Sequence, residues 1–276
     1  MSILTHDQYL ASVKQRIEMV RNASRTVVAG IPFTVFDLAG QPGSGTLAGT
    51  STVAPVMPTC STAGFPFINF STGVGYISRI EFNNSVASRF ALFDIISKSG
   101  AYGYAAGTTT ITTILDCSSR CPDYIGGADY GYGNEIWIEV STAFVTGTAW
   151  QVQVTYADQN GNVSTSIISA AQAAAALTLG KQFQIALAAG DSGVQSIRSV
   201  IVTNGGTAMT AGAFNVLILR PLNTSMRIPV ANGAAILNYL DTGMPIVYNT
   251  SALYPQVFAD STASGLPELN IEVASA

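Results

Sequence analysis

A dense succession of short β-type segments between Gly75 and Pro221 constrains the fold of this 276-residue chain more than any other feature. Each segment is rich in β-branched or aromatic residues and is bounded by Gly, Asn, Asp or Pro, as strands usually are. The segments are 76–82, 89–96, 109–115, 135–144, 150–156, 163–168, 183–187, 196–203 and 214–220. So many strands in about 150 residues favour an all-β, antiparallel β-sandwich of the jelly-roll type.

Turn signals separate several of these segments. Asn160-Gly161 lies between two of them and predicts a tight hairpin turn, and Asn204-Gly205-Gly206 predicts another. Further along the chain, weaker strands are expected at 226–230 and 246–248, with a short apolar segment at 234–240 between them. The β-rich character therefore extends towards the C-terminal end.

Two segments instead have the residue pattern of helices. In residues 5–22, Thr5 and Gln8 form a capping-box pair, and apolar side chains recur at helical spacing, at Leu10, Val13, Ile17 and Val20. An Ala-rich run at 169–179 has a similar capping pair and ends at Gly180. We therefore expect an N-terminal amphipathic helix, which needs an apolar surface to lie on, and one short helix within the β-region.

By composition the chain divides into four consecutive segments. Residues 1–26 are expected to form a helical arm. Residues 27–72, rich in Gly, Pro and Thr, are expected to form an extended arm, because they contain too many breakers for a central strand. Residues 73–222 are expected to form the β-sandwich, and residues 223–276 are expected to form a C-terminal extension. We expect the arms to lie across a folded body, either that of their own chain or that of a neighbour.

Charged side chains are scarce, with 12 Lys and Arg and 16 Asp and Glu in the chain, and the single histidine is His6. Charged residues make up about a quarter of an ordinary soluble domain. A surface so poor in charge loses little solvation free energy when a partner covers it. This favours a subunit of a larger assembly over a monomeric enzyme. The net charge of −4 gives no general attraction to nucleic acid.

The sequence also lacks the usual signals for a membrane. No apolar run approaches the roughly 18 residues of a spanning helix, and the first residues lack the basic and apolar regions of a signal peptide. We therefore expect no membrane partner and synthesis in a cytosol. A third of the basic residues lie before residue 26, whereas no Lys or Arg follows Arg227. Opposite ends of neighbouring copies could attract each other, or both ends could be solvated.

Three cysteines, Cys60, Cys117 and Cys121, leave little scope for a metal site. The spacing of Cys117 and Cys121 suits a local disulfide or half of a zinc site. A structural zinc site needs two more ligands, and only Cys60 and the distant His6 remain. We therefore expect reduced cysteines, no structural metal and no cofactor.

The strongest candidate for catalysis is the segment Glu135-Ile136-Trp137-Ile138-Glu139. On a strand, the two glutamates and Trp137 share one face, while the isoleucines point into the core. Paired carboxylates are typical of retaining glycosidases, and the segment is similar to the Glu-Ile-Asp-Ile-Glu strand of jelly-roll β-glucanases. Trp137 stands where that family has its central aspartate. We therefore interpret Glu135 and Glu139 as solvated acids on an exposed strand face and predict no catalytic residue.

Aromatic side chains cluster in two Gly-rich loops, at 102–104 and at 124–133. Exposed Tyr beside Gly and Asp can anchor a protein interface or stack on sugars. The same rings can also fold back and cap the open end of the sandwich. Trp137 and Trp150 are further candidates for stacking on sugars.

The helical arm, the extended Gly/Pro/Thr segment and strands such as 196–203 and 214–220 together resemble a bacteriophage virion structural protein. The pattern is similar to head decoration (cement) proteins and accessory capsid proteins. The resemblance implies a virion protein, made in the host cytoplasm, that binds the major capsid protein or other virion subunits, self-associates and catalyses nothing. The alternative is a carbohydrate-binding β-sandwich of a tail or adhesin, with the glycosidase as a third candidate.

Overall fold

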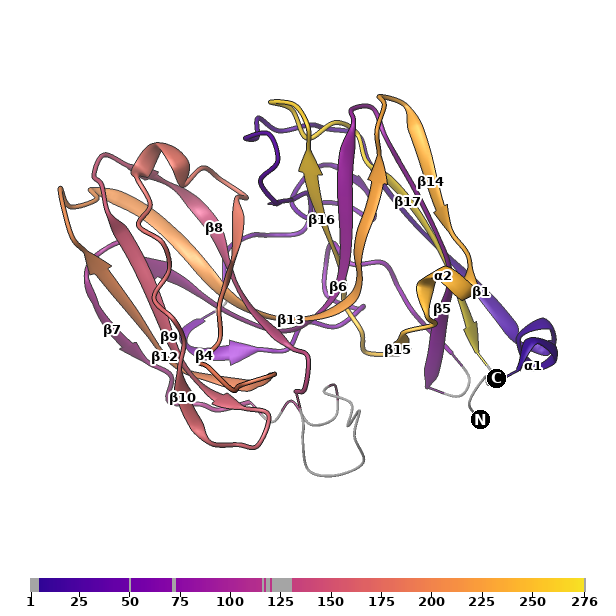
Figure 1. Ribbon diagram of the computed structural model, residues 1–276, viewed down its shortest axis with the longest axis horizontal. Coiled ribbons are helices and arrows are strands. Elements are labelled where there is room, and N and C mark those ends of the chain that lie inside the picture. Colours follow the sequence, from indigo (N-terminus) through magenta and orange to yellow (C-terminus); the bar gives the residue numbers. More distant parts are fainter. Residues whose placement is uncertain are drawn as a thin grey trace. The chain divides into compact units, whose positions relative to one another are not determined.

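The computed structural model describes residues 5–49, 51–70, 73–115, 117, 120 and 131–275, and most of its regular structure is antiparallel β-sheet (Figure 1). The prediction of an all-β, sandwich-type fold is confirmed. The chain forms two compact units. Unit 1 contains Met1–Thr46, Thr59–Asp94 and Leu222–Ala276, and unit 2 contains Leu47–Pro58 and Ile95–Pro221. The units are interleaved in sequence, whereas composition alone divides the chain into four consecutive segments.

Unit 1 is built on a six-stranded sheet in the order β14-β5-β17-β1-β3, with β15 also paired to β5. The bounds are Val13–Arg21 for β1, Gly40–Gln41 for β3, Val74–Asn84 for β5, Gly233–Leu237 for β14, Ile246–Tyr248 for β15 and Glu268–Ser275 for β17. The second layer contains β2 (Phe33–Thr34), β16 (Leu253–Ala259) and parts of β6 (Ser88–Gly103) and β13 (Ala211–Ile228), which both continue into unit 2. Two short helices, α1 (His6–Ala11) and α2 (Tyr239–Thr242), complete the unit.

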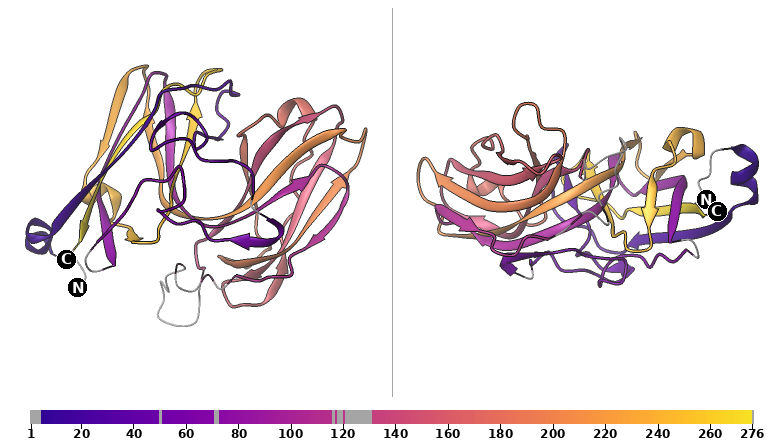
Figure 2. Two further views of the ribbon diagram at one scale, coloured as in Figure 1. Left: turned by 180° about the vertical axis from the view of Figure 1, so that it is seen from behind. Right: turned by 90° about the horizontal axis from the view of Figure 1, so that it is seen from below.

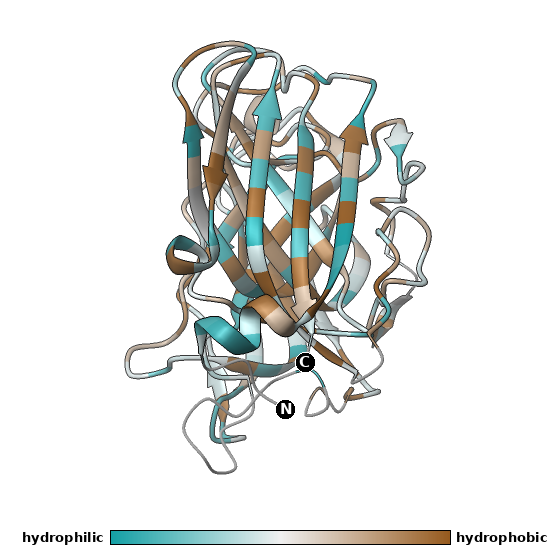
Figure 3. Cartoon of the chain, turned by 90° about the vertical axis from the view of Figure 1, so that its right-hand side faces the viewer, coloured by the Kyte–Doolittle hydropathy of each residue, from teal (hydrophilic) through white to brown (hydrophobic). Residues whose placement is uncertain are grey.

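The core of unit 1 lies between these two layers. Side chains that alternate along the six-stranded sheet, such as Ile17 and Met19 on β1 and Ile271 on β17, pack with Phe90 and Leu92 of β6. Hydrophilic and hydrophobic bands accordingly alternate along these strands (Figure 3). Because strand side chains alternate between faces, the polar residues between the core residues point to the outer face of the sheet.

Unit 2 is a sandwich of two layers. One layer is the sheet β10-β9-β12-β7, and the other contains β11, β8 and the unit 2 parts of β13 and β6, to which β4 is added. The bounds are Ser51–Val56 for β4, Gly107–Thr110 for β7, Glu135–Val145 for β8, Trp150–Asp158 for β9, Val163–Thr165 for β10, Gln182–Ile185 for β11 and Val194–Asn204 for β12. Trp150 is fully buried in the core. Its ring packs edge-to-face with those of Phe144 and Phe214, with ring centroids 5.0 Å apart in both pairs.

The N-terminal helix predicted for residues 5–22 is wrong beyond Ala11. α1 has the predicted capping box of Thr5 and Gln8, but β1 begins at Val13. β1 then pairs with β17 from Val13–Ser275 to Val20–Glu268, and the two strands lie side by side (Figure 2). Apolar residues in this region fit a period of two as well as a helical period, and pairing with a distant strand decides between them.

The helix predicted at 169–179 is also wrong, because that segment contains only the short 3-10 turn η1 (Ala174–Ala176). Residues 166–172 instead follow the edge of β9. The hydroxyls of Ser166 and Ser169 accept hydrogen bonds from the backbone N–H groups of Val154 (2.9 Å) and Val152 (3.0 Å). The N–H groups of the two serines donate to the carbonyls of the same two valines at 2.9 Å. An open strand edge offers backbone partners, which outweigh the weak preference of a short Ala-rich run for helix.

One of the two predicted turns is confirmed. Asn160-Gly161 joins β9 to β10, and Asp158 Oδ1 accepts hydrogen bonds from the N–H groups of Asn160 and Asn162 at 2.8 Å. The hairpin predicted at Asn204-Gly205-Gly206 is wrong, because β12 and β13 on either side of it belong to different sheets. The strand predicted at 109–115 is limited to β7, and the one at 226–230 is the end of β13. Within the described residues, no helix is long and apolar enough to cross a membrane.

Candidate interaction surfaces

The outer face of the six-stranded sheet in unit 1 is unusually rich in charge for this chain, and we call it the charged face. It contains seven of the 28 charged side chains (12 basic and 16 acidic), and we include with them the amide of Asn270, which lies among these charges. The eight residues are Lys14, Arg16 and Glu18 on β1, Arg79 and Glu81 on β5, and Glu268, Asn270 and Glu272 on β17. Buried residues such as Ile17, Ile80 and Ile271 lie between them, so strand alternation points all eight outward.

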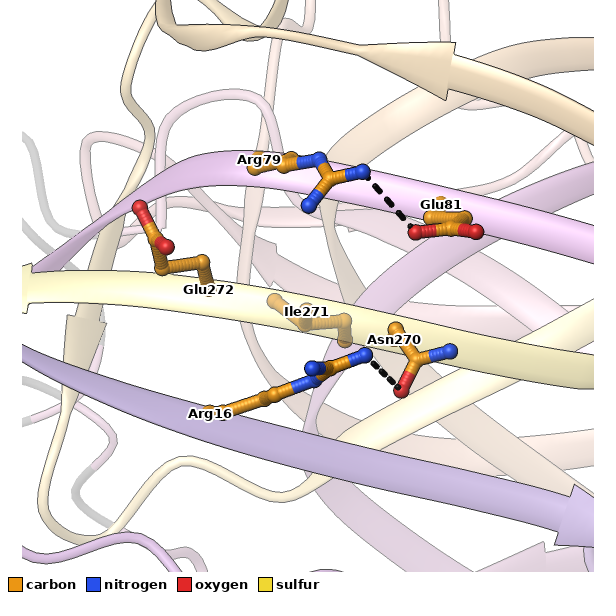
Figure 4. A pocket seen from close by; sticks show the side chains of 6 residues that line it. All are labelled: Arg16, Arg79, Glu81, Asn270, Ile271 and Glu272. Carbon is orange, nitrogen blue, oxygen red and sulfur yellow. Dashed lines mark hydrogen bonds and ion pairs between the residues drawn. The ribbon is translucent and has the colours of Figure 1, made fainter.

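Strand register arranges the charged face in rows across the sheet (Figure 4). Arg16 lies opposite Glu272, which lies opposite Arg79; in the next row Glu18, Asn270 and Glu81 lie opposite one another. Arg79 Nη2 donates to Glu81 Oε2 at 3.0 Å, and Arg16 Nη2 donates to Asn270 Oδ1 at 3.4 Å. The side chains border a shallow depression of about 50 Å³. The face thus presents a row with alternating charge beside a row that is mainly acidic.

An open groove of about 520 Å³ adjoins α1 and α2 in unit 1. The rings of Tyr9 and Tyr239 stack there with their centroids 4.8 Å apart, and the ring of His6 lies 6.0 Å from that of Tyr239. The Tyr9 hydroxyl donates to Glu272 Oε1 at 3.0 Å. Burial, helped by the hydrogen bond to the Glu272 carboxylate, raises the pKa of Tyr9 above its ordinary value. The groove offers aromatic and apolar surface, with His6 exposed at its margin.

The outer face of the four-stranded sheet in unit 2 has a very different composition, and we call it the hydroxyl–amide face. Its outward side chains alternate with buried ones such as Val152, Val154 and Val200. They are Thr108 and Thr110 on β7, Gln151, Gln153 and Thr155 on β9, and Ser199, Ile201 and Thr203 on β12, aligned by register. None of these eight is charged. Arg198 lies at the bulge of β12 that borders the face.

The structure corrects the interpretation of Glu135 and Glu139 as solvated acids on an exposed strand face. Ile136 and Ile138 point into the core as predicted, but Trp137 and Glu139 on the opposite face are also buried. Glu139 is fully buried, and its Oε1 lies 3.2 Å from Lys98 Nζ. Glu139 is therefore enclosed in an ion pair within unit 2.

Glu135 has a separate environment from Glu139. The Trp137 indole N–H donates to Glu135 Oε2 at 2.7 Å. Burial raises the pKa of Glu135, while the hydrogen bonds from Trp137 and Gln184 oppose that shift. The two carboxylates of the sequence motif thus have different partners, and only Glu135 is partly open to solvent.

The other predicted site residues are mostly buried or lie outside the described residues. Trp150 is fully buried and Trp137 nearly so, which leaves neither ring available as a platform for sugars. Tyr102 is buried, whereas Tyr132 is 37% exposed. Cys60 and Cys117 are buried, but Cys121 and the loop residues 124–130 lie outside the described residues. Among the described residues no cluster of His, Cys, Asp and Glu could hold a metal ion.

Two buried arginines, which are not among the predicted site residues, fasten extended segments to their own units. Arg21 donates from Nη1 to the carbonyls of Leu38 (3.2 Å) and Pro42 (2.6 Å), and burial lowers its pKa. Arg120 donates to the carbonyls of Pro58 and Ile95. A guanidinium has five N–H donors, so it can satisfy several carbonyls of an irregular segment at once. No local sequence pattern marks such residues, because their partners come from distant segments.

No family model and no curated protein matches the sequence. A search of solved structures finds weak likenesses. The VP2 subviral particle of infectious bursal disease virus is 11% identical over 96% of this chain and 81% of that chain, with a TM-score of 0.22. The Gt strain of the same virus is 9% identical over 95% and 81%, with a TM-score of 0.20. The VP1 pentamer of human polyomavirus 7 is 10% identical over 99% and 96%, with a TM-score of 0.14. TM-scores this low establish no shared fold.

Proposed function

We propose that this protein is a non-enzymatic structural subunit of a bacteriophage virion, which binds the capsid and reinforces it as a decoration (cement) protein. Its partner in this proposal is the major capsid protein or another virion subunit. It is made in the host cytoplasm, is located in the virion and associates with further copies of itself.

The observation that carries this proposal is the hydroxyl–amide face of unit 2. A charged side chain loses several kcal/mol of solvation when a partner buries it without a matching charge. Hydroxyls and amides lose much less, because they can exchange water for hydrogen bonds across the interface. A continuous face with Thr108, Gln153, Thr155 and Ile201 but no charge is therefore suited to permanent contact with another protein.

The surroundings of the candidate carboxylates also support a structural role. A retaining glycosidase needs two carboxyl groups that both reach the sugar. Glu139 is fully buried beside Lys98, where it neutralises an ammonium group instead. Arg21 and Arg120 serve structure as well, because their guanidinium groups donate to backbone carbonyls of their own units. This arrangement suits a protein whose role is contact.

The direct test is to purify particles from cells that produce this chain and to measure its amount in each density-gradient fraction. We expect the chain to sediment with the particles in a constant ratio to the major capsid protein. Its absence from particles, when it is present in the same lysate, would overturn the proposal.

A matched pair of variants tests the docking face. Thr108→Glu together with Gln153→Glu places two carboxylates on either side of Ile201 in the hydroxyl–amide face. We expect particle binding to fall by at least about tenfold, because a tenfold change needs only about 1.4 kcal/mol and each buried charge costs more than that. The control, Gln41→Glu, adds a carboxylate at an exposed position of unit 1 and should leave binding unchanged. Equal binding by both variants would exclude this face.

A further inference from the structure

The charged face of unit 1 has a charge pattern that is complementary to itself. Its central rows are Arg16–Glu272–Arg79 and Glu18–Asn270–Glu81. Lys14 lies beyond the first row, and Glu268 lies beyond the second. The end of the face with Lys14 is therefore basic, and the end with Glu268 is acidic. Successive outward residues on a strand are about 6.7 Å apart. The predominant charge therefore changes sign between one row and the next.

Several charges on this face have no counter-ion in the described part of the chain. Arg16 contacts the Asn270 amide at 3.4 Å, and Lys14 Nζ donates to the carbonyls of Tyr9 (3.1 Å) and Ser12 (3.5 Å). Neither forms an ion pair with another described residue, and the same is true of Glu18 and Glu268. Two basic and two acidic groups are thus available to a partner with the opposite pattern.

We propose that the charged face is the contact surface for a second copy of this chain, related by a two-fold axis. The axis lies in the interface, parallel to the rows, and passes between the two central rows. The rotation then places the first row of each copy over the second row of the other. Arg16 faces Glu18 of the second copy, Arg79 faces Glu81, and the Glu272 carboxylate faces the Asn270 amide. Every contact occurs twice, as in any isologous dimer.

The alternative two-fold axis, parallel to the strands and centred on β17, is disfavoured by charge. This rotation would place each row over the same row of the second copy. Arg16 would then face Arg79 of the second copy, and Glu272 would face Glu272. Like charges placed against each other weaken an interface and exclude that arrangement. The pattern therefore specifies the orientation of the partner as well as its identity.

The size of the surface sets the expected strength of this contact. Three strands about 4.8 Å apart and four rows about 6.7 Å apart cover roughly 400 Å² per copy. Interfaces this small belong to the weak class. We therefore expect a dimer that forms at high protein concentration, that weakens as salt is added, and that would gain strength when several copies are held close together.

Charge-swap variants of the full chain test the proposal by sedimentation equilibrium over roughly 1 to 300 µM protein, the range of a weak dimer. Arg16→Glu places like charges at both symmetric contacts and should raise the dimer Kd by about tenfold or more. Arg16→Glu with Glu18→Arg reverses both members and should restore the Kd to within about threefold. The matched control swaps Arg227 and Asp260, an exposed ion pair of unit 1 outside the charged face, and should leave the Kd unchanged.

A chain that stays monomeric throughout this range, an unchanged Kd for Arg16→Glu, or a double variant that does not recover would each overturn the proposal. Thermal unfolding at low concentration shows whether Arg16→Glu is folded. If it is not, Arg79→Glu alone and with Glu81→Arg provides the same comparison at the other pair. The assay contains only this chain, so its failure is distinct from a failure of particle binding, which is tested on the hydroxyl–amide face of unit 2.

Discussion

Replacing Lys98 by Met is expected to destabilise unit 2 severely, because the fully buried Glu139 carboxylate would lose the ammonium group that lies beside it. Lys98 Nζ lies 3.2 Å from Glu139 Oε1, and the two side chains are 9% and 0% exposed. Asn215 Nδ2 and Gln182 Nε2 also donate to Glu139, at 2.9 and 3.3 Å, and both remain in the variant. Hydrogen bonds from amides do not replace the charge of the lost ammonium group. We therefore expect the free energy of unfolding to fall by about 3–5 kcal/mol.

The double variant Lys98→Met with Glu139→Gln separates charge from packing. It removes both charges, and an amide at position 139 can still accept the hydrogen bond from Asn215. We expect it to be more stable than Lys98→Met alone, with a coupling free energy of about 2 kcal/mol or more between the two sites. Urea unfolding followed by tryptophan fluorescence is a suitable assay, because Trp137 and Trp150 are both buried in unit 2.

Two results would refute this reasoning. One is a loss of less than about 1 kcal/mol in Lys98→Met, which is the range of an exposed ion pair. The other is strict additivity of the two single variants in the double variant. Thr142→Ala, at an exposed position of the same strand β8, serves as the control. It should change stability by no more than about 0.5 kcal/mol.

Two further predictions concern unit 2. Burial raises the pKa of Tyr102 from 10.0 to about 12. The folded state therefore favours the neutral phenol, and its contribution to stability is fully present below pH 10. This contribution, up to about 3 kcal/mol of unfolding free energy, is lost as the pH rises towards 12. The measurement is urea unfolding of the wild type and of Tyr102→Phe between pH 10 and about 12. The prediction is contradicted if the unfolding free energies of the two proteins fall with pH in parallel. Ser169→Ala removes the hydroxyl that accepts a hydrogen bond from Val152 N–H. It should lower the free energy of unfolding by about 1 kcal/mol and speed hydrogen exchange of the Val152 amide. The control, Ser164→Ala on β10, should leave that exchange unchanged.

Local patterns in the sequence are sufficient to predict the class of fold and many of its elements. On β9, Val152, Val154 and Tyr156 are buried while Gln151 and Gln153 face outward, as the two-residue period predicts. The turn at Asn160-Gly161 and the capping box of Thr5 and Gln8 also form as predicted. These features depend on residues a few positions apart, so a single sequence contains the information that they need.

Segments with two acceptable local structures are decided by pairing with distant strands. Residues 13–21 fit both a helical period and a strand period, and β17, from the far end of the chain, selects the strand. Residues 169–172, predicted as the start of a helix, instead form backbone hydrogen bonds with the edge of β9. Backbone hydrogen bonds to a neighbouring strand outweigh small differences in intrinsic propensity.

The sequence by itself established that the chain is an all-β protein with few charges, but the places of those charges depend on the tertiary structure. Glu139 looks like a surface residue in the alternating strand pattern, yet the fold buries it beside Lys98. Arg16 and Asn270 come together across 254 residues of sequence to form part of the charged face. Electrostatic interactions depend on distance in space and on burial, and only the assembled sheets bring residues this far apart in sequence to within reach of each other.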